Sequence, residues 1–534
     1  MLFLSCNPTA NYHPVKKSHE DAKTANTDKS NEDSMKDSSS DDDSSGNTET
    51  KDDSTGGDDT SGNPADDNDD DKDEEGEEED NKDDDGMDDN QQPPVKLTEV
   101  NYKAPAPYTY PNDYNDPNSS SLPKRHMLVW QDTPSSEVVV NWGVDEFNAG
   151  QEHMVFLSET QQNGIDPDNN YELKFAATES GLVTRIGNID PPCDGANDSN
   201  IQVKVTGLKP NTTYYYITRS NGQKSKEMHF VTAPSDTEVS FKLLSGGDSR
   251  SQIGQRQMMN DVMNSMVTAD PQYIALVHGG DFINTGSSCE QWRNWRNDHQ
   301  RTILENGRII PVVATFGNHE STGTDGEGEK IYNAIFGDPR AEGTFYFLST
   351  IGNLSLIILN SEISALGDQQ EWLQGTLETL KNKENHLIVA GYHAPAWPAN
   401  KSPARTTAWV DEFQNYQVNL VLESDGHTLK QTCPIFVFGN LDDDEYNCDV
   451  DKGIIYVGEG GLGVNQREAV RANRAYFNPD FGGYATSQLH VQSLSVTSTG
   501  NEPSKLIYEV VFPDSTFNHK IELMSKDRKQ LGNN

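Results

Sequence analysis

The sequence predicts a protein of three parts: an acidic tail without a hydrophobic core, a β-sandwich and an α/β layered domain. The first 90 residues contain few apolar side chains, and short β-branched and aromatic runs follow up to about residue 235. From Glu238 onward, strand-like runs alternate with longer amphipathic segments. The predicted boundaries are 1–98 for the tail, 99–236 for the sandwich and 237–534 for the α/β domain.

The predicted tail carries about half of the net charge. Residues 1–90 hold 31 Asp and Glu against 8 Lys, a balance of −23 out of a total of −44. Such a segment cannot bury enough apolar surface to offset the entropy lost on ordering, so we expect it to be disordered. It is interpreted as a self-repelling tether, with a weak reservoir for divalent cations as the alternative.

The charge pattern also bears on the partner. The rest of the chain is moderately acidic, with a balance of −21, and has no basic stripe. Binding along a phosphate backbone requires clustered Lys and Arg, so we expect no nucleic acid partner. A small phosphorylated molecule remains compatible with this balance.

The amino terminus, MLFLSCNP, resembles the end of a bacterial lipoprotein signal. Cys6 follows a short apolar run and opens the polar tail. The resemblance implies export to the bacterial cell envelope or the medium, with membrane anchoring through a lipidated Cys6. Only five residues precede Cys6, whereas an export signal has an apolar core of roughly 7 to 15 residues, so the true start lies upstream or the signal is not functional.

Four further cysteines are consistent with export. Cys433 and Cys448 are close enough in sequence to close a short loop, which leaves Cys193 to pair with Cys289. The alternative is four free thiols in a cytosolic protein.

Five short runs predict the strands of the sandwich, separated by clusters of Pro, Asn, Gly and Asp. They are MLVWQ at 127–131, VVVNWGV at 138–144, HMVFLS at 153–158, IQVKVTGL at 201–208 and TYYYITRS at 213–220. The stretch GLKPNTTYYY, with Leu208 and Tyr214, resembles the tyrosine corner of fibronectin type III modules. Such modules usually position neighbouring domains or bind ligands, and they rarely catalyse reactions.

The α/β pattern rests on eight apolar runs and one clear helix. The runs are FKLLSGGD, YIALVHGGD, RIIPVVATFGNHE, FYFLST, LSLIILNS, HLIVAGYHAP, NLVLESDGH and GIIYVGEGG. Residues 368–383 place Trp372, Leu373, Leu377 and Leu380 on one helical face. The sequence context distinguishes two histidines. His278 lies inside an apolar strand and is expected to be a hydrogen-bonded core residue, whereas His299 lies on a charged helix and is expected to be solvated.

Polar residues follow five of these apolar runs directly. They are Asp248, Asp281, Asn318 with His319, His393, and Asp425 with His427. Sites in α/β sheets form at the carboxyl ends of strands, and polar groups after buried strands are costly unless they find partners. The carboxylate, amide and imidazole groups, without thiolates, suit manganese, zinc, iron or magnesium. The five ends therefore predict a shared metal centre.

In this order, GDSR, GGDFINTG, GNHE, GYHAP and SDGHTLKQTCP resemble the motifs of the calcineurin-like metallophosphoesterases. The preceding sandwich and the later YVGEGGLG resemble the purple acid phosphatase branch. The resemblance covers about residues 120 to 530 and implies an α/β/β/α layered phosphoesterase domain. It also implies two divalent or trivalent metal ions, of manganese, zinc or iron.

The resemblance assigns metal ligands residue by residue. Asp248 would bind the first metal, Asp281 would bridge both, and Asn318 and His393 would bind the second. The purple phosphatases have a metal-binding tyrosine where this chain has Asn284. We therefore expect no tyrosinate-to-iron colour, and Asn284 is kept as a candidate ligand of the first metal.

The family motif Gly-His-x-His has two possible registers here. A literal match pairs Gly426 and His427 with the first Gly-His, and then Leu429 replaces the second histidine. The ungapped register makes Asp425 replace the first histidine and His427 the second. We favour the ungapped register because Asp is a competent ligand for hard divalent metals and Leu is not. It assigns His427 to the first metal and Asp425 to the second.

The resemblance implies hydrolysis of phosphoric esters, with monoesters favoured over diesters, by a bridging water or hydroxide. His319 would stabilise the transferring group or protonate the leaving oxygen. Arg250 would clamp a phosphate oxygen, with a surface salt bridge as the alternative. Two other functions stay open at this point: a phosphodiesterase or nucleotidase on the same scaffold, and a surface-anchored binding protein whose metal domain is idle.

Overall fold

The computed structural model describes residues 97–107, 122–145, 152–177, 183–184, 199–322, 326–340, 343–439, 445–499 and 502–528. The predicted disordered tail falls almost entirely outside the described residues, as do Cys6 and Cys193. No helix in the described ranges is long and apolar enough to cross a membrane.

The N-terminal part consists of two antiparallel sheets. One contains β2 (Lys124–Val129), β3 (Val138–Val144), β6 (Val183–Thr184) and β7 (Ser199–Val205). The other contains β4 (His153–Ser158), β5 (Leu173–Ala176), β8 (Thr213–Ser220), β9 (Gln223–Lys224) and β10 (Met228–Val231). A four-residue helix, α1 (Pro167–Asn170), lies between β4 and β5. Leu128, Trp142, Val155, Tyr216 and Phe230 from both sheets share one core, as expected of a sandwich.

The predicted tyrosine-corner residues are both buried. The Tyr214 hydroxyl accepts a hydrogen bond from the backbone N–H of Lys209 at 3.0 Å, and Leu208 is 4% exposed. This bond fixes the connection between β7 and β8. The closer likeness to fibronectin type III modules stays a prediction.

The sandwich is joined to the rest of the fold by a shared sheet. β2 runs parallel to β13 (Val312–Ala314), with Val129 opposite Val312. β1 (Thr98–Glu99) adds to β11 (Val239–Gly246). One hydrogen-bonded sheet of 11 strands therefore extends from β25 through β13 into the sandwich. The hydrogen bonds of this sheet continue from the sandwich into the α/β part. The predicted domain boundary between residues 236 and 237 therefore stays a prediction.

Five other strands of that sheet belong to the α/β part. They are β11, β12 (Tyr273–His278), β23 (Val491–Thr497), β24 (Lys505–Val511) and β25 (Phe517–Met524). β11, β12 and β13 are parallel neighbours. Three helices pack on one face: α2 (Ile253–Ala269), α3 (Cys289–His299) and α4 (Glu327–Phe336).

A second sheet has the order β14-β15-β16-β17-β21-β18-β22. Its strands are β14 (Phe347–Ile351), β15 (Leu354–Ile358), β16 (Leu387–Gly391), β17 (Leu420–Glu423), β18 (Leu429–Gln431), β21 (Ile455–Gly458) and β22 (Tyr484–Thr486). Helices α5 (Asp368–Leu380) and α6 (Val410–Asn415) pack on one face. β19 (Ile435–Val437) and β20 (Tyr446–Cys448) form a separate hairpin-like pair.

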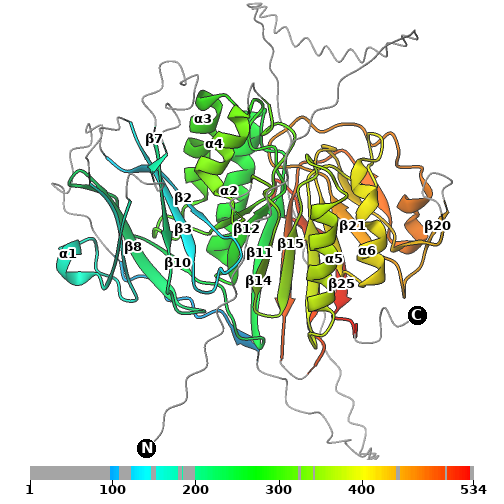
Figure 1. Cartoon of the computed structure of the whole chain (residues 1–534), viewed down its shortest axis with the longest axis horizontal. Coiled ribbons are helices and arrows are strands. Elements are labelled where there is room, and N and C mark those ends of the chain that lie inside the picture. Colours follow the sequence, from blue (N-terminus) through cyan, green and yellow to red (C-terminus); the bar gives the residue numbers. More distant parts are fainter. Residues whose placement is uncertain are drawn as a thin grey trace, which may run out of the picture. The chain divides into compact units, whose positions relative to one another are not determined.

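The alternation of side chains along the strands produces four layers (Figure 1). Leu243 of β11 and Val389 of β16 belong to the core between the two sheets. The neighbouring residues point outward, Leu244 to the cluster with α2 and α3, and Ile388 to the cluster with α5 and α6. Successive strand residues face opposite sides of a sheet, so the central strands of both sheets are buried on both faces. The α/β domain thus has the order α/β/β/α.

The predicted disulfide between Cys433 and Cys448 is present and joins the segment before β19 to the last residue of β20. Cys289 is also disulfide-bonded. Its predicted partner Cys193 lies outside the described residues.

Candidate metal centre

The predicted ligands follow strands of two different sheets. Asp248, Asp281 and Asn318 follow β11, β12 and β13 of the first sheet, and His393 and Asp425 follow β16 and β17 of the second. Within each group the strands are parallel neighbours, so their carboxyl ends share an edge. The structure brings these ends together where the two sheets meet.

Four of the candidate ligands have a left-handed backbone. The φ angles are 56° at Asp248, 57° at Asp281, 65° at Asp425 and 54° at His427. This conformation is uncommon outside glycine and costs of order 1–3 kcal/mol per residue in strained cases. Because four neighbouring ligands share this conformation, the turns orient their side chains toward one another.

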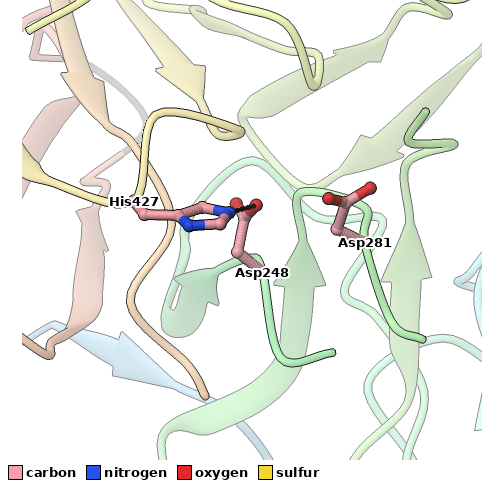
Figure 2. Close-up of side chains that lie close together, drawn as sticks. All are labelled: Asp248, Asp281 and His427. Carbon is pink, nitrogen blue, oxygen red and sulfur yellow. Dashed lines mark ion pairs between the residues drawn. The ribbon is translucent and has the colours of Figure 1, made fainter. Parts of the chain in front are cut away.

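One cluster contains Asp248, Asp281 and His427 (Figure 2), each with a ligand atom within 4.8 Å of the others. His427 Nε2 is 3.2 Å from Asp248 Oδ1. The side chains of all three are 5% exposed or less. Two carboxylates and an imidazole thus meet in a buried space.

A second cluster shares Asp281 and adds His393 and Asp425. His393 Nε2 is 3.2 Å from Asp281 Oδ1, 3.0 Å from Asn318 Oδ1 and 3.9 Å from Asp425 Oδ1. Asp281 is therefore the common member of both clusters. The structure brings Asp425 and His427 to separate clusters, which is the arrangement that the ungapped register requires.

The donor atoms fit metal ions. His393 Nδ1 donates to the carbonyl oxygen of Gly279 at 2.7 Å, which leaves Nε2, facing the oxygens of Asp281 and Asn318, to supply a lone pair to a metal ion. Asp248 Oδ1, Asp281 Oδ2 and His427 Nε2 are buried without a hydrogen-bond partner among the described residues. Carboxylate oxygens and imidazole nitrogens that meet at this spacing are the atoms that bind cations, and this oxygen and nitrogen set suits hard or borderline ions.

The pKa shifts of two residues in the clusters also favour the binding of positive charge. Burial by itself lowers the pKa of His393, but Asp281, Asp248 and Asp425 raise it well above its usual value. Burial alone would raise the pKa of Asp281, yet His393, His319 and Arg250 hold it below its usual value. Positive charge is therefore favoured at this spot, and Asp281 stays ionised.

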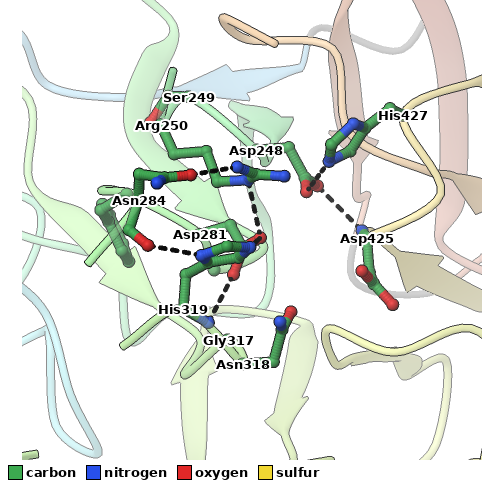
Figure 3. Close-up of polar contacts among 12 residues, drawn as sticks. Asp248, Ser249, Arg250, Asp281, Asn284, Gly317, Asn318, His319, Asp425 and His427 are labelled. Atoms are coloured by element: carbon green, nitrogen blue, oxygen red, sulfur yellow. Dashed lines mark hydrogen bonds and ion pairs between the residues drawn. The ribbon is translucent and has the colours of Figure 1, made fainter. Parts of the chain in front are cut away.

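The two predicted catalytic residues lie at the edge of the first cluster (Figure 3). Arg250 Nε is 3.3 Å from Asp281 Oδ2, and its Nη1 donates to the side-chain oxygen of Asn284. His319 Nδ1 donates to the backbone oxygen of Asn284 at 2.6 Å, and His319 Nε2 is 3.8 Å from Asp281 Oδ2. Asn284 thus contacts both residues. Its side-chain oxygen already accepts a hydrogen bond from Arg250.

Glu320 is a site residue that sequence reasoning missed. Its carboxylate is fully buried and accepts backbone hydrogen bonds from Asp281 at 2.8 Å, Phe282 at 2.9 Å and Gly317 at 3.0 Å. Burial and the charge of Asp281 raise its pKa to about 8. Glu320 holds the turn that carries the shared carboxylate against the turn that carries Asn318. The available signal was its place directly after Gly-Asn-His.

Of the two histidines assigned by context, only one prediction holds. His278 is buried, and its Nε2 lies 3.0 Å from Ser249 Oγ. His299 is not solvated: it is 3% exposed and stacks on Trp295 with ring centroids 5.0 Å apart. The charged composition of α3 concealed a face that packs on the sheet.

A buried ion cluster supports the loop that carries Asp425 and His427. Lys430 Nζ donates to Glu423 and, at 2.9 Å, to Glu459, and all three side chains are fully buried. Thr428 donates to Glu459 at 2.6 Å. The cluster ties both ends of the loop, residues 423 and 430, to β21.

Gly317 permits the close approach of the two turns, and we predict that Gly317→Ala weakens metal binding. A Cβ there would lie 2.5 Å from Asp281 Oδ1 and 2.6 Å from Asp281 N. The expected loss is tenfold or more in affinity, by titration with Mn²⁺ or Zn²⁺, because Asp281 must move. The control Gly375→Ala has open space in α5 and should leave binding unchanged. Equal affinity in both variants would contradict the role given to Gly317.

Comparison with known families matches both parts of the chain. The family described as "Purple acid Phosphatase, N-terminal domain" matches residues 123–232. The family described as "Calcineurin-like phosphoesterase" matches residues 235–431. The second range contains every predicted ligand and both predicted catalytic residues.

Individual relatives agree with these matches. Purple acid phosphatase 15 of Arabidopsis thaliana is 23% identical over 389 residues, which are 66% of this chain and 69% of the relative. Purple acid phosphatase 21 of the same plant is 26% identical over 249 residues, which are 44% of this chain and 53% of the relative.

Solved structures show the same fold. A purple acid phosphatase isolated from yellow lupin (Lupinus luteus) seeds superposes with a TM-score of 0.59 at 16% identity, covering 75% of this chain and 74% of that one. The structure of PhoD superposes with a TM-score of 0.50 at 13% identity, covering 76% and 93%. Residues 123–232 and 235–431 therefore match the two domains of a metallophosphoesterase of the purple acid phosphatase type, and these matches indicate a phosphatase of the hydrolase class.

Proposed function

We propose that the chain hydrolyses small phosphoric monoesters at a dinuclear metal centre. The observation that carries this proposal is the pair of ligand clusters that share Asp281. Asp248, Asp281 and His427 would hold the first ion, and Asp281, Asn318, His393 and Asp425 the second. When bound, the two ions supply Lewis-acid charge that lowers the pKa of a water molecule and stabilises the transferring phosphoryl group.

His319 is placed to handle the proton of the leaving group. Its Nδ1 donates to the backbone oxygen of Asn284, so Nε2 is the atom that gains or loses the exchangeable proton. Nε2 faces the edge of the cluster, 3.8 Å from Asp281 Oδ2, and the side chain is 22% exposed. A proton on Nε2 can therefore reach an ester oxygen that lies beside Asp281.

Arg250 supplies fixed positive charge on the same side. Its guanidinium is held by Asp281 and Asn284 and is 14% exposed. Arginine presents several N–H donors in a rigid plane, so groups not used for Asp281 and Asn284 remain for a phosphoryl oxygen. Asn284 stands where the family that the motifs resemble has a metal-binding tyrosine, and its side-chain oxygen accepts from Arg250. We propose manganese, zinc or a colourless iron centre.

The test is hydrolysis of a chromogenic phosphomonoester and the matching diester by the full chain. The protein is stripped with EDTA and reloaded with Mn²⁺, Zn²⁺ or Fe²⁺. We expect turnover only after reloading, and faster turnover of the monoester. Diester preference would favour the phosphodiesterase or nucleotidase alternative. A folded protein that takes up metal but hydrolyses neither ester would overturn the proposal and leave the binding-protein alternative.

A prediction follows for the two registers of the Asp425 and His427 motif. Asp425→Ala and His427→Ala should each lose about one of the two ions, because the residues belong to different clusters. Metal content per chain, measured by elemental analysis after gel filtration, checks this. If Asp425→Ala retains both ions with wild-type affinity, Asp425 is not a ligand and the literal register holds.

We also propose that the protein is exported and anchored through a lipidated Cys6. The disulfide between Cys433 and Cys448 supports an oxidising compartment. Metabolic labelling with a fatty acid, in the wild type and in Cys6→Ser, tests the anchor. Equal label in both would contradict it.

A further inference from the structure

Lys401 is a second cationic side chain at the metal centre, in addition to Arg250. Neither the sequence motifs nor the family resemblance assigned it a role. Its ammonium forms an ion pair with Asp425 Oδ2. The other oxygen of the same carboxylate, Oδ1, faces His393 Nε2 at 3.9 Å. One carboxylate therefore contacts both the second cluster and Lys401.

The backbone that presents Lys401 is fixed. The N–H of Ala399 donates to the buried Glu459 at 3.1 Å, and its carbonyl oxygen accepts from the N–H of Arg471 at 2.9 Å. The side chain of Asn400 donates to the carbonyl oxygen of Glu468. These contacts hold Lys401 beside Asp425 before any substrate arrives, so little entropy is lost when it binds an anion.

Charge explains why a lysine is tolerated beside two cations. In the ungapped register, Asp425 replaces a neutral imidazole and adds one negative charge to the second cluster. Lys401 adds one positive charge in contact with that carboxylate. The charges of Asp425 and Lys401 add up to zero, which is the charge of a neutral imidazole. The pair also places an ammonium group beside the second cluster.

The ammonium has donors left for a ligand. It carries three N–H groups, and Asp425 is its one hydrogen-bond acceptor among the described residues. The Lys401 side chain is 34% exposed, so it can be reached from solvent. Arg250 contacts Asp281, whereas Lys401 contacts Asp425, which belongs to the second cluster alone. A phosphoryl group bound at the centre would therefore meet Arg250 beside Asp281 and Lys401 beside Asp425.

Resting on the proposed function, we infer that Lys401 binds the phosphoryl group and determines the preference for monoesters over diesters. A monoester is a dianion near neutral pH, whereas a diester carries one negative charge and replaces one phosphoryl oxygen by an ester oxygen. Two fixed cations beside the group favour the dianion. Lys401 thus distinguishes the two ester classes by the negative charge of the phosphoryl group and by the number of its non-ester oxygens.

The experiment compares Lys401→Met and Lys401→Arg with the wild type. Inorganic phosphate is titrated calorimetrically into the metal-loaded full chain, metal content is counted, and kcat and KM are measured for matched mono- and diesters. We expect Lys401→Met to bind phosphate roughly 10- to 100-fold more weakly, as for a lost charge-assisted hydrogen bond. It should keep both ions. Monoester kcat/KM should fall by a similar factor and diester kcat/KM by less than about threefold.

The Lys401→Arg variant should recover most of the phosphate affinity. Lys209→Met, which removes an ion-paired lysine of the N-terminal part, is the matched control and should change nothing. Unchanged phosphate affinity in Lys401→Met would overturn the inference. Loss of an ion in that variant would overturn it too, because Lys401 would then be a positioning residue for Asp425. If the wild type lacks turnover but binds phosphate through Lys401, the proposed hydrolysis and the ester preference fail, and the phosphate-binding role of Lys401 stands.

Discussion

Replacing Asp281 by Asn is expected to remove both metal ions and to lower kcat/KM by at least about 1,000-fold. Asp281 is the one residue that the two clusters share, and its Oδ1 and Oδ2 face different neighbours, His393 and Arg250. Asparagine keeps the shape but removes the charge that attracts both cations. Metal ions contribute several kcal/mol to such reactions, and about 1.4 kcal/mol is a factor of ten.

The measurement combines elemental analysis with kinetics on the monoester. Asp261→Asn is the matched control, because Asp261 forms an exposed ion pair with Arg301 on the surface. The control should retain two ions and full activity. A metal-free Asp281→Asn variant with wild-type turnover would show that hydrolysis does not depend on this centre.

The centre was predictable because its residue types follow apolar strands directly. A carboxylate such as Asp248 or Asp281 at the end of a buried strand needs a partner, and parallel strands place such ends at one edge. The strands at 138–144, 153–158 and 213–220 have the predicted bounds because β-branched and aromatic residues fill them.

The supporting contacts were not predictable in the same way. Lys401 and Asp425 are 24 residues apart, and Lys430 and Glu459 are 29 residues apart. A charged residue in a single sequence resembles a surface residue until its distant partner is known. The pairing of β2 with β13 is equally non-local. His299 was misjudged because α3 is charged in composition, whereas Trp292 and Trp295 place one face in the core.

The buried ion cluster gives the largest expected effect on stability. Lys430→Met should destabilise the fold by about 3–5 kcal/mol, because it leaves Glu423 and Glu459 buried without their cation. Glu423 also accepts two hydrogen bonds from neutral groups. Tyr392 donates to it at 2.6 Å, and the N–H of Ala396 donates to the same oxygen at 2.7 Å. These neutral donors cannot replace the missing charge.

The loss should grow as the pH rises. Burial already raises the pKa of Glu459 above its usual value, despite the opposing effect of Lys430. Without Lys430 the pKa rises further. A raised carboxyl pKa favours the folded state when the group is protonated, and that contribution is lost as the pH rises through the folded-state pKa. The gap between wild type and Lys430→Met should therefore be small near pH 4 and wide near pH 8.

Urea unfolding of the full chain at several pH values, followed by circular dichroism, measures this gap. Lys520→Met removes an exposed ion pair with Glu522 and should leave the free energy of unfolding nearly unchanged at every pH. Lys430→Met combined with Glu459→Gln should recover part of the loss, because one of the two unpaired charges is gone. A pH-independent loss that Glu459→Gln does not relieve would mean that Lys430 acts through packing, and the electrostatic account of the loop would be wrong.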